Sequence, residues 1–292
     1  MSINISTKGY YFGYKTLVVI FTKSGRIKIY DEHNIDYVIN SNDSPTPATS
    51  TTTLHNIPTD IFNKIQRGDH IIVYSGPTDL YGITGEGNIT QIQQNSDDGT
   101  AQNTVITFVE GVNLSSKALK ANFNGAKTVK KAKSKKINAT FKKNATAKQI
   151  LTKVAKLSNI KIYHFKLAKN KKYKRGYTIS NHPYNAMKKI VNDCDSKMYQ
   201  RKGKLVIDDL KTDNPFKEHL FLSLGSGLLQ EPSLSDNVKN SKTYTLECWD
   251  DTRLCAGSCV YVKSKNLDNL YKVQSVQHTH NNNYRMEVII YG

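Results

Sequence analysis

The sequence predicts a mainly β protein with an α+β insert, in which two similar antiparallel β-barrels flank a small two-helix α+β domain. Two stretches about 190 residues apart carry the same pattern, GDHIIVYSGPTDLYGI from Gly68 and GSCVYVKSKNLDNLYKV from Gly257. Apolar and polar residues alternate in both, which is typical of strands with one buried face. Between them, apolar residues recur at the helical period, so a different kind of domain is expected there.

Composition agrees with this fold class. The chain of 292 residues suffices for two or three domains, and it contains 17 tyrosines against one tryptophan. Tyrosine, with the many threonines, isoleucines and valines, favours strands. Hydrophobic residues make up 38% of the chain, below the usual share, which indicates a core divided among small units.

The first third of the chain predicts strands. Tyr14–Tyr30 contains two apolar runs around Gly25, the pattern of a hairpin. Asn40–Thr53 is polar and contains prolines, so we expect a loop that runs into a strand. Pro58 can begin a short helix or turn that Gly68 ends. The further strands expected here are His70–Ser75, Gly82–Gln93 and Thr104–Glu110.

The middle third predicts a basic linker followed by a compact α+β module. Leu114–Lys136 is rich in lysine, alanine, serine and asparagine and reads as a linker or exposed arm. A strand and an amphipathic helix with Thr146 at its N-cap come next. A second helix begins at Pro183, and a hairpin turns at Lys202 and Gly203. The residues expected on the apolar face of the first helix are Ala147, Ile150, Leu151, Val154 and Leu157.

The last quarter returns to strands and carries the second copy of the repeated pattern. Aligning Gly68 with Gly257 places Val73 on Val262, on the same strand face. One inserted residue then places Leu80-Tyr81 on Leu270-Tyr271. Any antiparallel barrel can show such a pattern, but the shared order of strand, short link, glycine, strand, turn and two strands favours a duplication. The strands expected here are Tyr244–Trp249, Cys259–Ser264, Tyr271–His278 and Tyr284–Tyr291.

These elements divide the chain into four segments. We expect a first barrel in residues 1–113, a basic arm in 114–136, an α+β domain in 137–215 and a second barrel in 216–292. The longest apolar run near the start, Thr16–Phe21, is too short to cross a membrane. The N-terminus lacks the basic and apolar regions of a signal peptide, so we expect no Sec export.

The net charge of +18 belongs entirely to the middle of the chain. Between Gly111 and Asn192 there are 22 of the 42 lysines and arginines and no acidic residue. Three interpretations stay open: a nucleic-acid site with nearby aromatic rings, a surface for an acidic partner protein, or a solvated surface. The rings that could stack on bases are Tyr163, Phe165, Tyr173 and Tyr177. The candidate contact residues are Lys130, Lys131, Lys133, Lys135 and Lys136.

No catalytic or cofactor site is predicted. The cysteines, Cys194, Cys248, Cys255 and Cys259, match no zinc spacing and read as buried, reduced thiols. His278 and His280 share a strand face and read as surface positions at a strand end. The paired carboxylates, such as Asp250-Asp251, are adjacent and would point apart on a strand. A cell-wall hydrolase is therefore the least supported function class, and we expect no enzyme, metal or cofactor.

The order of elements and the C-terminal motif resemble the baseplate hub proteins of tailed bacteriophages, and most closely the short hubs of phages and prophages of Gram-positive hosts. Three stretches carry the likeness: TTTLHNIPTDIFNKIQRGDHIIVYSG, then NATAKQILTKVAKLSNIKI with the following helix and hairpin, then GSGLLQEPSLSD to the end. Leu270 departs from the glycine common before the tyrosine of the family motif. The residues that match this motif are Gly227, Leu228, Pro232, Leu254, Gly257, Val260, Val262, Ser264, Tyr271, Val273 and His278.

The resemblance implies a structural function in a virion tail, assembled in the host cytoplasm. Two barrels per chain give six in a trimer, which can present a pseudo-six-fold face to a six-fold partner. The implied protein is a homotrimeric hub between the tail tube, or a distal tail protein, and the tail tip, spike or tape-measure protein, lining the passage for DNA. A nucleic-acid-binding protein that uses the basic middle region is the alternative.

Overall fold

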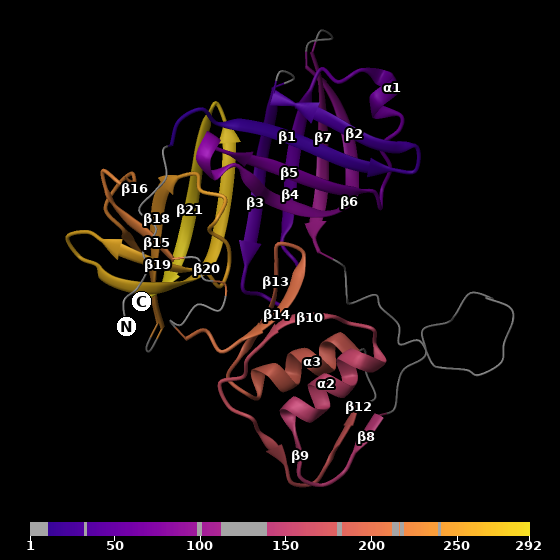
Figure 1. Ribbon diagram of the computed structural model, residues 1–292, viewed down its shortest axis with the longest axis vertical. Coiled ribbons are helices and arrows are strands. Elements are labelled where there is room, and N and C mark those ends of the chain that lie inside the picture. The colour runs from indigo at the N-terminus through magenta and orange to yellow at the C-terminus, as the bar shows by residue number, and fades with distance from the viewer. Residues whose placement is uncertain are drawn as a thin grey trace, which may run out of the picture. The chain divides into compact units, whose positions relative to one another are not determined.

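A computed structural model describes residues 11–31, 34–97, 101–111, 139–179, 183–211, 216, 219–238 and 241–292 (Figure 1). The chain forms two compact units. The first, the β unit, comprises Met1–Val112, Gln200–Gly203 and Lys211–Gly292. The second, the α+β unit, comprises Asn113–Tyr199 and Lys204–Leu210. One hairpin is thus divided between the units. Its turn, Gln200–Gly203, is assigned to the β unit, and the residues before and after this turn are assigned to the α+β unit.

The β unit contains a sheet of 14 strands, and the described chain is mainly β with few helices. Its N-terminal strands are β1 (Lys15–Thr22), β2 (Gly25–Tyr30), β3 (Ile35–Asn42), β4 (Thr49–His55), β5 (His70–Gly76), β6 (Gly82–Asp97) and β7 (Ala101–Glu110). Its C-terminal strands are β15 (His219–Leu224), β16 (Gly227–Leu228), β17 (Ser233–Val238), β18 (Ser241–Trp249), β19 (Cys259–Lys263), β20 (Asp268–Asn281) and β21 (Asn283–Tyr291). Two short helices, α1 (Thr59–Phe62) and the 3-10 helix Thr78–Leu80, complete the unit.

Six C-terminal strands close into a barrel. Each strand pairs with the next in the order β16, β18, β21, β20, β19, β15, and β15 pairs with β16 to close the ring. Alternate residues of these strands point inward and fill the interior, as the strand period of two requires. The interior side chains include Leu222, Leu246, Val260, Val262, Val273, Val288 and Ile290, all 0% exposed.

The N-terminal strands bury a second core. They follow one another in the order β3-β4-β7-β6-β5-β1-β2 and enclose a cluster that includes Ile20, Leu54, Ile71, Val73 and Ile106. The hairpin of β1 and β2 confirms the expected pattern around Gly25. In contrast, β3 was not predicted, although Ile35, Tyr37 and Ile39 lie at alternate positions and are buried.

The two glycine-containing stretches form the same local structure. Gly68 and Gly257 both have positive φ, 92° and 79°. The Gly68 N–H donates to the Ile89 carbonyl, as the Gly257 N–H donates to that of Val273. The residue after each glycine closes the turn that contains the glycine. The Asp69 carboxylate accepts a hydrogen bond from the Gln66 N–H, and the Ser258 hydroxyl accepts one from the Cys255 N–H.

The correspondence continues into the next strands, but not as the sequence alignment predicts. The ladder of β6 with β7 is bulged directly after Ile89, and that of β20 with β21 directly after Val273. Strands β5, β6 and β7 therefore correspond to β19, β20 and β21. The alignment of Leu80-Tyr81 with Leu270-Tyr271 is wrong, because Leu80 ends the 3-10 helix whereas Leu270 lies within β20.

The α+β unit packs two helices against short strands around its own core. The helices are α2 (Ala147–Leu157) and α3 (Pro183–Asn192). The strands are β8 (Ala139–Phe141), β9 (Ala145–Thr146), β10 (Ile162–Phe165), β11 (Lys172–Tyr173), β12 (Tyr177–Ile179), β13 (Lys197–Arg201) and β14 (Lys204–Asp208). Four of the five apolar positions expected on α2 are buried, whereas Leu157 is 40% exposed, because it lies at the last turn of the helix.

Candidate functional site

The lysines proposed from the sequence as partner contacts cannot be placed. Lys130, Lys131, Lys133, Lys135 and Lys136 lie outside the described residues. In the described part of the same basic region, acidic residues beyond Asn192 offset part of the charge. Lys171 pairs with Asp193, Lys166 with Asp209, and Lys169 with Asp195.

Most of the candidate aromatic rings of the basic region pack against the hydrophobic core of the α+β unit. Phe165, Tyr173 and Tyr177 pack against the buried cluster of the α+β unit. The Tyr173 hydroxyl also donates to Asp193, and burial raises the pKa of this phenol. Tyr163 is 58% exposed, but the Lys204 ammonium lies 4.6 Å from its ring centroid. Base stacking would therefore require rings that are already engaged.

The described residues contain no group of three or more histidines, cysteines or acids able to hold a metal ion. All four cysteines are buried, as predicted. Burial raises the pKa of the Cys248 thiol well above its usual range, so this thiol stays protonated near neutral pH.

His278 is a buried residue, and its prediction as a surface position is wrong. Its side chain is 2% exposed, and its ring joins two acceptors. Nδ1 lies 2.5 Å from an Asp250 carboxylate oxygen, and Nε2 lies 3.1 Å from the Leu254 carbonyl oxygen. A histidine in a strand pattern gives no sign of an acceptor 28 residues away, which is why sequence reasoning missed it.

Asp250 connects the two halves of the β unit. Besides His278, its carboxylate accepts a hydrogen bond of 2.9 Å from the Tyr37 hydroxyl, which also bonds the Ser75 hydroxyl at 2.8 Å. Its backbone carbonyl accepts from the Tyr14 hydroxyl. Burial and the neighbouring Asp250 carboxylate hold the pKa of Tyr37 well above its usual value. This network is buried and fully bonded, so it acts as a structural joint.

The joint continues as a shared sheet. The second half of β20 pairs with β3 from Ser275↔Asn42 to His280↔Tyr37, which makes the two sets of strands one sheet. Around it, the Tyr284 ring stacks on both Tyr14 and His280, with centroids 4.3 and 3.7 Å apart. The two halves are thus held together by backbone pairing as well as by side chains.

Besides β2, which ends the sheet and pairs with β1 alone, two further strand edges of the β unit stay open within the described residues. The first half of β6 pairs with both β5 and β7, but its second half, Gln91–Asp97, pairs with β7 alone. Strand β17 pairs with β18 alone. An open edge presents unpaired backbone N–H and C=O groups, which can accept a strand from another chain. These edges are therefore candidate assembly surfaces.

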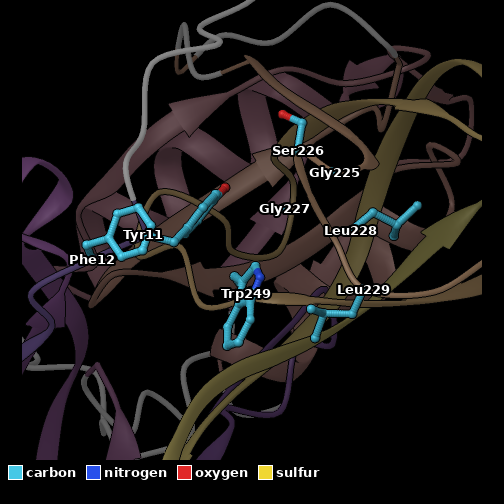
Figure 2. Close-up of a pocket in the computed structure, with 8 residues that line it drawn as sticks. All are labelled: Tyr11, Phe12, Gly225, Ser226, Gly227, Leu228, Leu229 and Trp249. Atoms are coloured by element: carbon cyan, nitrogen blue, oxygen red, sulfur yellow. The ribbon is translucent and has the colours of Figure 1, made fainter.

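A cleft of about 570 Å³ lies beside β16 (Figure 2). Tyr11 and Phe12 lie on one side of it, across from Leu228 and Leu229, and Trp249 lies between them. Phe12 is 78% exposed and Trp249 37% exposed. The cleft thus offers aromatic surface next to the backbone of a short, glycine-containing segment.

The cleft explains part of the C-terminal motif. Gly227 has a φ of +90°, and a Cβ there would lie 2.9 Å from the Tyr11 hydroxyl oxygen and from a Leu222 methyl carbon. Leu228, the next motif residue, is 4% exposed and belongs to the barrel core. Glycine is required at 227 by backbone conformation and by space, whereas leucine at 228 fills the core.

No family model matches the sequence, and no curated protein matches it. None of the described helices is long and apolar enough to span a bilayer.

Solved structures do match the fold. The 43 kDa tail protein of prophage MuSo2 from Shewanella oneidensis matches with a TM-score of 0.65 and 11% identity, covering 96% of this chain and 98% of that one. A tail protein from Neisseria meningitidis MC58 matches with a TM-score of 0.62 and 12% identity, covering 96% of each chain.

A third structure extends the likeness beyond phages. The E. coli c3393 protein, described as a type VI secretion component structurally similar to T4 tail proteins gp27 and gp5, matches with a TM-score of 0.53 and 8% identity, covering 97% of this chain and 75% of that one. At such low identity the matches concern the fold. The chain therefore has the fold of phage tail proteins, the fold that its resemblance to baseplate hub proteins implied.

Proposed function

We propose that the chain is a structural hub of a phage tail baseplate, of the kind found in phages and prophages of Gram-positive hosts. Three copies form a ring that joins the six-fold tail tube to the three-fold tail tip and lines the passage for DNA. The work of such a hub is to adapt symmetry, and it requires no catalytic step.

The duplicated glycine turn is the observation that carries the proposal. The hydrogen bonds of Gly68 and Gly257 and the bulges that follow Ile89 and Val273 mark the same three-stranded unit twice in one chain. We infer that the N-terminal strands and the closed C-terminal barrel are two versions of one tube-type barrel. Residues 1–113 and 216–292 then form the barrel domains, with the arm 114–136 and the α+β domain 137–215 between them.

A repeat within the chain supports a trimer by symmetry. Three copies with two similar units each place six similar units around one axis, whereas all other parts repeat three times. One face of the ring can then match a six-fold tube, and the other can match a three-fold tip. The match to two tail-protein chains over 98% and 96% of their length supports a tail function for this chain.

The neighbouring structures also support the kind of partner. Two of them are described as complexes of PdpA with VgrG, and one as similar to gp27 and gp5. We propose that this chain likewise contacts other tail proteins: a tube or distal tail protein on one side, and a tip, spike or tape-measure protein on the other. Its place is the virion tail, after assembly in the bacterial cytoplasm.

The test is electron cryo-microscopy of the intact particle. We expect density for three copies of this chain between the tail tube and the tip, with six similar β units around the axis. Density that places the chain elsewhere in the particle would contradict the proposal. Density that shows only one such β unit per chain around the axis would contradict it as well.

Nucleic-acid binding by the basic middle region is the second candidate, favoured by the 22 basic and no acidic residues between Gly111 and Asn192. Neutralising Lys130, Lys131, Lys133, Lys135 and Lys136 together would then abolish binding to DNA near physiological salt. If these lysines are only solvated, the wild type and the neutralised variant should bind DNA equally weakly near physiological salt.

A further inference from the structure

The internal joint between β20 and β3 shows how one β unit of this fold pairs with another. Six consecutive residue pairs join the strands, from Ser275↔Asn42 to His280↔Tyr37. The Gln277 side chain adds a hydrogen bond of 3.0 Å to Asn40. If the chain contains two versions of one β unit, the N-terminal set of strands also contains a counterpart of β20. The C-terminal set likewise contains a counterpart of β3.

The counterpart of β20 in the N-terminal set is β6. Val273 corresponds to Ile89, because each residue precedes a bulge and bonds back to a glycine turn. Counting past the bulges, Ser275 corresponds to Gln91 and His278 to Gln94. The second half of β20, which pairs with β3, therefore corresponds to the second half of β6.

The counterpart of β3 in the C-terminal set is β17. Gln91 pairs with Thr107 and Thr107 with Thr51, which in turn pairs with Val38. In the second set the same path runs from Ser275 through Ile289 and Thr245 to Ser233. Val38 thus corresponds to Ser233, and the next residue, Ile39, corresponds to Leu234.

The two counterparts, the second half of β6 and strand β17, both lie at open edges of the sheet. Within the described residues, the second half of β6 pairs with β7 alone and β17 pairs with β18 alone. Ile39 is 3% exposed at the internal joint, whereas Leu234 is 52% exposed. His278 is buried, whereas Gln94 is exposed. Each edge therefore has the exposure expected of half a joint whose other half is not among the described residues.

The composition of the edges also indicates pairing. Natural sheets protect free edges with lysine, other charges or proline. Strand β2, at the other end of the sheet, follows this rule with Arg26 and Lys28. The open half of β6 and strand β17 contain no lysine, arginine or proline, although the whole chain has 42 basic residues, and their charged residues are Asp97, at the end of β6, and Asp236. Opposed glutamine, asparagine and serine side chains bring no like charges together.

We propose that β6 of one copy pairs antiparallel with β17 of the next copy, in the register that joins β20 to β3 within the chain. Gln94 then lies opposite Leu234 of the neighbouring copy, as His278 lies opposite Ile39. The occupant of each edge is a second copy of this chain, because the complementary edge is its own. The inference rests on the proposed trimer, since three such joints alternate with three internal ones to close the ring.

Disulfide cross-linking of the full-length chain tests the register. Residues directly opposite in antiparallel strands have Cα atoms about 4.5–5.5 Å apart, within the range for a disulfide. The double variant Gln94→Cys/Leu234→Cys should form covalent trimers after mild oxidation, separated on a non-reducing gel. The native cysteines are buried and give a low background. The matched control is Gln93→Cys/Leu234→Cys, because residue 93 points to the opposite face of the strand.

The wild-type mass in solution separates two kinds of failure. A trimeric wild type with no more cross-linking for Gln94→Cys/Leu234→Cys than for its control would overturn the register and leave the trimer. A disulfide that closes within single chains would overturn the register as well. A monomeric wild type would overturn both proposals.

A charge placed on the open edge gives an independent readout. Leu234→Lys should shift the chain from trimer to monomer at a concentration where the wild type is trimeric, with an unchanged circular dichroism spectrum, because residue 234 is exposed in the single chain. Lys28→Glu, on the protected edge, should leave the mass unchanged. Trimers of normal stability for Leu234→Lys would contradict the proposed joint.

Discussion

Asp250 is the residue that links the two halves of the β unit most directly. It is 0% exposed, and its bonds reach Tyr37 and Tyr14 in the N-terminal half and His278 in the C-terminal half. A buried carboxylate is costly unless its oxygens are bonded, so Tyr37 and His278, which bond the two carboxylate oxygens, compensate for its desolvation. The network therefore fixes how the two halves meet.

Removing one hydroxyl from this network tests its contribution. Tyr37→Phe should lower the free energy of unfolding by about 1–3 kcal/mol, because it removes the hydrogen bonds that the Tyr37 hydroxyl makes with one buried carboxylate oxygen of Asp250 and with the Ser75 hydroxyl. Urea unfolding followed by circular dichroism measures the change. The control is Tyr30→Phe on an exposed ring, which should change stability by less than about 0.5 kcal/mol. Equal, small effects of both variants would contradict the role of the network.

Glu110 gives the β unit a pH dependence. Burial raises the pKa of its carboxyl from 4.5 to about 7, although N–H groups of Lys202 and Gly203 favour the charged form. The folded chain therefore binds more protons than the unfolded chain between these values. This group makes stability fall as pH rises from about 4.5 to 7, by about 3 kcal/mol, with no further change above.

The variant Glu110→Gln should lose this pH dependence. The difference in free energy of unfolding between variant and wild type should therefore shift in favour of the variant by about 3 kcal/mol from pH 4.5 to pH 8. Urea unfolding at the two pH values measures the difference, with Glu287→Gln, on an exposed strand position, as the control. The same difference between wild type and Glu110→Gln at both pH values would contradict the assignment.

At the scale of elements, local patterns predicted most of the secondary structure. The first hairpin, the strands of both glycine stretches and the helix beginning at Pro183 depend on neighbouring residues, which the sequence displays. Strand β3 was missed, since its polar end merged with the following loop. The Leu-Tyr alignment failed because two turns of different length follow otherwise equivalent strands. Such differences depend on pairing partners, which lie far away in the sequence.

The cap of α2 shows a local prediction that the structure confirms. The Thr146 hydroxyl accepts from the Gln149 N–H, and the Gln149 side chain accepts from the Thr146 N–H. Thr146→Ala should therefore cost about 1 kcal/mol of stability in the α+β unit. Thr152→Ala, an exposed position on the same helix, should cost nothing. Amide hydrogen exchange of α2 measures both, and equal protection in the two variants would contradict the cap.

At the scale of the whole molecule, the proposed function depends on the repeated glycine turn and strands. The sequence predicted the mainly β character of the fold and the tail-protein resemblance, because a repeated strand pattern and a C-terminal motif are local signals. It could not predict the buried joint, whose partners Tyr37 and Asp250 are 213 residues apart, or the open edges, which are defined by pairings that are missing. The candidate lysines were chosen by charge alone, and they stay a prediction.

The central claim is that one chain supplies two similar β units and three chains complete a ring. Native mass spectrometry of the purified full-length protein tests this most directly. We predict a particle close to three times the chain mass of 32.9 kDa, present at physiological ionic strength. A particle that stays at the mass of one chain, or forms pairs, would contradict the account.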